Sequence, residues 1–160
     1  MSDRAIDLAN QLESAAAEVA DVAASLSEAQ WTAICPADGR QNNVMIDHIS
    51  TTFAQVTPLA EMIIAGQDLP EITMDMVHAG NSAHASEQTG AARADVLASL
   101  KANASAAAAT IRTWSDTDLD MSRPFALSPS GSISVAGMVQ GILIDHAKHH
   151  LADLTAGLSS

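Results

Sequence analysis

Apolar residues recur at steps of three and four along the first 26 positions, which is the periodicity of an amphipathic helix. These positions are Ala5, Leu8, Leu12, Ala15, Val19, Val22 and Leu26. Ser2 or Asp3 is suited to cap the start, because a short polar side chain there accepts hydrogen bonds from free backbone N–H groups. The stretch "SLSEAQW" continues or closes this helix near Trp31. Pro36 and Gly39 in "CPADGRQNN" then indicate a loop.

A second helix is predicted from Asn42 or Asn43 to about Ala65, where Gly66 follows as a terminator. Pro58 removes one backbone donor inside it, so a kink or break is expected near Val56. The inner stripe of this helix is formed by Met45, Ile49, Thr52, Val56 and Ile63, with His48 on the same side.

The rest of the chain predicts two more helices. Residues 70–90 show no sustained periodicity, so a long connection with short helical turns is expected there. A third helix is predicted from about Ala91 to Trp114, and the connection "SDTDLDMSRPFALSPSGS" leads to a fourth, capped by Ser132 or Ser134. The inward face of the third helix consists of Val96, Leu97, Leu100, Ala104, Ala107, Ala108 and Ile111. With no segment indicating a strand, residues 1–160 are predicted to form one all-α domain, a four-helix bundle.

Composition agrees with this fold and excludes several classes of partner. Alanine is abundant and tyrosine is absent, which favours helices over strands. The net charge of -12, with 7 basic against 19 acidic residues, disfavours nucleic acid as a partner. No stretch has the form of a secretory signal or a membrane span, and the single Cys35 cannot form an internal disulfide. We therefore expect a cytoplasmic protein with no membrane partner.

Histidines are concentrated in "DHAKHHLADL" near the end of the fourth helix, which holds three of the six in the chain. His146 and His150 are four residues apart, so their side chains lie on one helix face, with Cβ atoms roughly 5–6 Å apart. They continue the apolar stripe of Val135, Val139 and Ile142, and this places them toward the core. His149 lies about 100° away from His150 and faces elsewhere. The pair is spaced to hold one metal ion.

A catalytic metal site usually needs a third protein ligand and an open position. His48 is the best candidate, since it lies on the inner stripe of another helix, whereas His78 and His84 are expected to be solvated. Asp47 and Asp145 are either solvated acids or acceptors for a ligand histidine on another helix. Ala147 follows His146, so the general base of a His-Glu-x-x-His protease is absent. A metal-free network of buried histidines remains an alternative.

The arrangement resembles the DinB-like superfamily, which includes the mycothiol-dependent maleylpyruvate isomerases. The resemblance rests on "LSEAQW", on a glycine turn before "VMIDHIS", on "WSDTDLD", and on "GSISVAGMVQGILIDHAKHHLADL" with its His-x-x-x-His signature. It implies a four-helix bundle, a frequent homodimer, and a zinc or nickel ion on His48, His146 and His150. The implied activities are thiol-dependent isomerisation and transfer with mycothiol, bacillithiol or glutathione-like cosubstrates. No separate catalytic base is assigned.

Two positions depart from the family pattern. Arg40 follows Gly39 where family members commonly have tryptophan, and Asp153 stands where relatives often have glutamine. The leading hypothesis is a metal-dependent enzyme that acts on a small molecule. If its cosubstrate is an anionic thiol, the negative charge would need a positively charged partner, and the few candidates are Arg40, Arg123 and Lys148. The second hypothesis is a non-enzymatic bundle that binds metal structurally or pairs with a protein partner. A fourth protein ligand, from His149 or an acid, would favour the second hypothesis.

Overall fold

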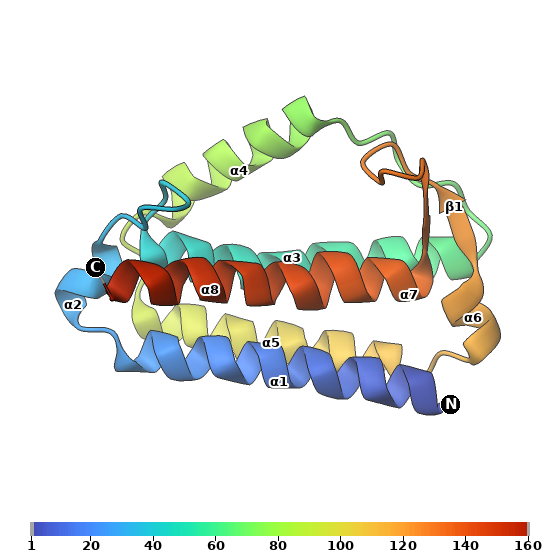
Figure 1. Ribbon diagram of the computed structural model, residues 1–160, viewed down its shortest axis with the longest axis horizontal. Helices are drawn as coiled ribbons and strands as arrows, with labels where there is room; N and C mark the ends of the chain where they lie inside the picture. The colour runs from blue at the N-terminus through green and yellow to red at the C-terminus, as the bar shows by residue number, and fades with distance from the viewer. Residues whose placement is uncertain (1, 160) are drawn as a thin grey trace.

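The computed structural model describes residues 2–159 and is a bundle of long helices (Figure 1). Its main rods are α1 (Asp3–Ser25), α3 (Asn42–Ile64), α5 (Arg93–Ile111) and a last rod made of α7 (Val135–Met138), η1 (Val139–Asp145) and α8 (His146–Leu158). The short helices α2 (Glu28–Thr32) and α6 (Asp116–Asp120) lie at opposite ends of the bundle. The all-α prediction and the four main helices are confirmed. None of the described helices is long and apolar enough to cross a membrane.

The core is formed where the predicted stripes face one another. Leu12 and Val19 of α1, Phe53 of α3 and Leu100 of α5 are at most 1% exposed. α5 packs most extensively against α1 and α3, and its buried alanines supply the small face that such close packing needs. Ser2 caps α1, as expected, by accepting a hydrogen bond from the backbone N–H of Ala5.

Pro58 does not interrupt α3, so the break expected near Val56 does not occur. Proline removes one hydrogen bond from the ladder, and the packing of this buried helix outweighs that loss. Gly66 then follows the end of α3 with a φ of +75°, a conformation that favours glycine.

The connection between the second and third predicted helices is itself a helix, α4 (Met74–Gln88), capped by Thr73. The expectation of a mostly non-helical loop was therefore wrong. α4 has no fully buried residue, so its sequence carries no strong apolar stripe by which it could be recognised. It packs against α3 and is splayed away from the rest of the bundle (Figure 1).

The connection after α5 contains a small hairpin, which the sequence pattern did not predict. β1 (Ser122–Pro124) pairs antiparallel with β2 (Ser132–Ser134), with Arg123 opposite Ile133. Strands of three residues are too short to show an alternating pattern. Ser134 then caps α7 by accepting from the N–H of Gly137, as expected for one of the two predicted capping serines.

The last rod contains a seven-residue π-helical segment, η1, that ends directly before His146. Such segments are wider than an α-helix and are frequent at functional sites. Before η1 the buried positions include Val135 and Met138, and after it they include Ala147, His150 and Leu154. The wider segment takes up about one extra residue. Each residue of α8 therefore lies about 100° around the helix axis from where an uninterrupted α-helix of the same sequence would place it.

Candidate metal centre

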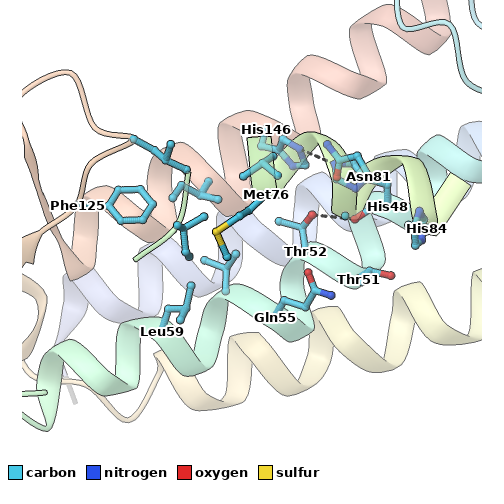
Figure 2. A pocket seen from close by; sticks show the side chains of 16 residues that line it. His48, Thr51, Thr52, Gln55, Leu59, Met76, Asn81, His84, Phe125 and His146 are labelled. Carbon is cyan, nitrogen blue, oxygen red and sulfur yellow. Dashed lines mark hydrogen bonds between the residues drawn. The ribbon is translucent and has the colours of Figure 1, made fainter. Parts of the chain in front are cut away.

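Three histidines from two separate parts of the chain converge at one point. His48 is in the second turn of α3, His146 is the first residue of α8, and His150 follows one turn later. The Nε2 atom of His146 lies 3.1 Å from the Nε2 of His48 and 3.1 Å from the Nε2 of His150. Figure 2 shows His48 and His146 facing each other at one end of a cavity. The structure thus brings together the three residues predicted to act as ligands.

Hydrogen bonds among the three rings cannot account for both of these short Nε2–Nε2 distances. An imidazole nitrogen carries either one proton or one lone pair, so Nε2 of His146 makes at most one well-directed hydrogen bond to its two neighbours. Two nitrogen ligands of a tetrahedral ion are expected about 3.3 Å apart, given bonds of about 2.0–2.1 Å. The potential ligand atoms of these three histidines all lie within 4.8 Å of one another. In the described part of the chain, no fourth residue belongs to this group. The donor set therefore fits a metal ion with an open side.

The surroundings keep the three rings neutral near pH 7. Burial, followed by the positive charge of Arg40, lowers the pKa of His48 to about 3. Burial and the neighbouring His150 lower the pKa of His146 to about 4. The pKa of His150 is also lowered, first by burial and then by Arg40. Neutral imidazole is the form that binds metal, so the environment favours coordination.

Asp38 and Arg40 form an ion pair behind His150, in the turn that precedes α3. Nη2 of Arg40 donates to Oδ2 of Asp38 at 2.7 Å, and this hydrogen bond lowers the pKa of Asp38. The same carboxylate oxygen lies 3.6 Å from Nδ1 of His150, the ring atom that faces away from the cluster. Arg40 thus holds the carboxylate that lies against the back of His150.

A cavity of about 600 Å³ lies between α3, α4 and the hairpin connection, and His48 and His146 form part of its wall. His84 of α4 also lines it, with Nε2 2.7 Å from Oδ2 of Asp47. The expectation that His84 is solvated was wrong, because α4 folds over α3 and covers its ring. A signal for this was the helical spacing of Val77, Asn81 and His84, which is hard to recognise because the three residues differ in polarity.

The other candidates lie outside the cluster. His78 is exposed, and His149 is exposed and points toward Asp153, with 3.4 Å between Nε2 and Oδ2. Asp145 accepts a hydrogen bond from Gln140 and not from a ligand histidine. Cys35 is buried in the turn before α3, where its Sγ donates to the carbonyl of Asp153. Arg123 and Lys148 do not line the cavity.

Acidification is expected to destabilise the metal-free protein between about pH 6.5 and pH 4. The lowered pKa values mean that the unfolded chain, with histidine pKa near 6.5, binds more protons in this window than the folded chain. The free energy of unfolding therefore falls as the pH falls. Urea unfolding in the presence of a chelator, at several pH values, measures this slope. A His48→Gln variant should show a smaller slope, and equal slopes would contradict the assignment.

Comparison with known proteins adds one finding. The family model for the DinB superfamily matches residues 8–154, which include all three clustered histidines. Searches of curated proteins and of solved structures gave no match. The matched range runs from the first turns of α1 to the last turns of α8, so it spans the whole bundle. The chain belongs to the DinB superfamily.

Proposed function

We propose that the protein is a metal-dependent enzyme in which His48, His146 and His150 hold a divalent ion, zinc or nickel, beside the cavity. The observation that carries this proposal is the convergence of three neutral Nε2 atoms at the wall of a cavity large enough for a small molecule. Catalytic zinc sites typically have three protein ligands and an open position, whereas structural sites are closed by four.

When bound, such an ion supplies Lewis acidity and lowers the pKa of a coordinated water or thiol, which makes that molecule a nucleophile near neutral pH. The residues of the chain position the reactants. Asp38 lies against the outer nitrogen of His150 and favours one orientation of that ring. Thr51, Gln55 and Asn81 supply hydrogen-bonding groups in the cavity wall near the histidines.

Thiol-dependent transfer or isomerisation is the reaction class that we infer from the DinB-like resemblance. Membership of the superfamily supports it, as does the affinity of sulfur ligands for zinc. Arg40 is bound to Asp38, and none of Arg40, Arg123 and Lys148 lines the cavity. This arrangement favours a thiol whose remaining groups are uncharged over an anionic one.

Cobalt substitution tests the proposal, because Co²⁺ reports its own coordination in the visible spectrum. One Co²⁺ per chain is expected to bind, and a small thiol such as 2-mercaptoethanol should add a sulfur-to-cobalt charge-transfer band. The same titration on a His48→Ala variant serves as the control and should give no band. A spectrum of bound Co²⁺ that no added thiol, azide or hydroxamate changes would indicate a closed, structural site. That outcome would favour the non-enzymatic alternative.

A further inference from the structure

The cavity changes in character along its length. Its polar end contains His48, His146, Thr51, Gln55 and Asn81, and these side chains lie together in Figure 2. Leu59 and Phe125 lie at the other end in the same view. Along α3 the lining residues therefore pass from hydrogen-bonding to apolar side chains, and the metal centre is at the hydrogen-bonding end.

The cavity wall carries no fixed charge. Among the described residues that line it there is no lysine, arginine, aspartate or glutamate. Burying a carboxylate, phosphate or ammonium group without a partner is costly, because the group loses its hydration and gains nothing in return. A ligand can therefore place a charged or metal-binding group at the histidines, whereas any other part of it that becomes buried in the cavity should be uncharged.

The dimensions favour an extended ligand. Leu59 is eleven positions after His48 on the continuous helix α3, which corresponds to about 16 Å at about 1.5 Å per residue. Gly80 lies on the opposite wall, in α4, and a Cβ added there would meet no atom within 4 Å. Glycine inside a helix costs roughly 0.5–1 kcal/mol relative to alanine, yet at this position it leaves space in the cavity.

We propose that the cavity binds a small molecule with a single metal-binding polar head group and an uncharged, largely apolar body. The assignment of the head group rests on the proposed function, since this group would coordinate the ion held by His48, His146 and His150. The body would lie along α3 toward Leu59 and Phe125. A ligand whose body carries several carboxylates or hydroxyls would leave those groups without partners in this half of the cavity.

Hydroxamic acids of different length test the proposal on the zinc-loaded protein by calorimetry. Octanohydroxamic acid is expected to bind more tightly than acetohydroxamic acid, with a gain of up to about fourfold for each methylene that becomes buried. Suberic monohydroxamic acid has the same chain length but ends in a carboxylate, and it should lose most of this gain. Equal affinity for the short and long compounds, or for the two long compounds, would overturn the proposal.

Two neighbouring residues of α4 provide matched variants. Gly80→Leu places a side chain in the cavity, whereas Ala79→Leu adds the same side chain at an exposed position that does not line it. Gly80→Leu is expected to keep its zinc and its affinity for acetohydroxamic acid, and to bind octanohydroxamic acid at least tenfold more weakly. Ala79→Leu should match the unmodified protein in all three measurements. A loss of affinity common to both variants would contradict a role for the cavity.

Failure of this proposal differs from failure of the proposed function. Stoichiometric zinc without any preference for chain length would overturn the apolar body and leave the metal centre standing. Absence of zinc binding would overturn the metal centre. Binding of the apolar body of the ligand is then tested separately, with 1-octanol on the metal-free protein. Binding of 1-octanol that Gly80→Leu abolishes would support the apolar cavity, and absence of binding would overturn it.

Discussion

Replacing His146 with alanine is expected to abolish stoichiometric metal binding while the bundle still folds. His146 is central to the cluster, because its Nε2 lies 3.1 Å from both other Nε2 atoms. Its removal leaves two ligands, and the loss should exceed the roughly 10–100-fold drop in affinity caused by mutating a partner that only supports a ligand. The side chain lines a cavity and is half-buried, so truncation enlarges the cavity without removing a fully buried core residue.

Metal analysis after dialysis against zinc, together with a calorimetric titration, measures this effect. His149→Ala is the matched control, since His149 lies three residues away on the same helix and its side chain is 73% exposed. The control is expected to keep one ion per chain. A His146→Ala protein that still holds one equivalent of zinc with unchanged affinity would contradict the site assignment.

Deleting Gly141 is expected to keep the metal site, although the deletion lies in the helix that carries two of its ligands. Gly141 lies inside η1, is exposed, and has open space around its Cα. Loss of one residue allows this segment to become a plain α-helix while α8 keeps its rotational position relative to α7, because the wide segment already takes up about one extra residue. His146 and His150 would still face His48, and Leu154 would stay in the core. Zinc binding should be kept, with one ion per chain.

Gly141→Ala keeps the chain length and provides the control for the deletion. A Cβ at this position meets no atom within 4 Å, so this variant should bind zinc like the unmodified protein. Circular dichroism of both variants reports whether the helices have formed. A helical deletion protein that has lost its zinc would show that the wider segment does not simply take up one extra residue.

The sequence predicted the parts of the molecule in which one physical signal dominates. The apolar stripes of α1, α3 and α5 predicted the bundle, because burial of such a stripe is the main source of helix stability in a protein. His48, His146 and His150 were found because each continues an apolar stripe. The helix α4 was missed since none of its residues is fully buried, and with it the position of His84 was missed.

Contacts that depend on tertiary structure could not be predicted in the same way. Asp38 approaches His150 across 112 residues of sequence, and no local pattern encodes this approach. The π-helical segment was not predicted either, because the stripe of Val139, Ile142, His146 and His150 is equally compatible with an uninterrupted α-helix. On an uninterrupted α-helix, His149 and Asp153 would face the core in nearly the same direction as His146. The exposure of His149 is explained by the extra residue in η1.

The distance along the chain between the ligands has a consequence for folding. His48 and His146 are separated by 98 positions, so an ion shared between them would act as a cross-link that closes a very long loop. In the chain-entropy model, closing a loop of about 100 residues removes conformational freedom from the unfolded chain worth at most about 4–5 kcal/mol. The single Cys35 offers no covalent cross-link within the chain. An ion at the three histidines would thus fasten the last helix to the first half of the protein, as a disulfide does in other small domains.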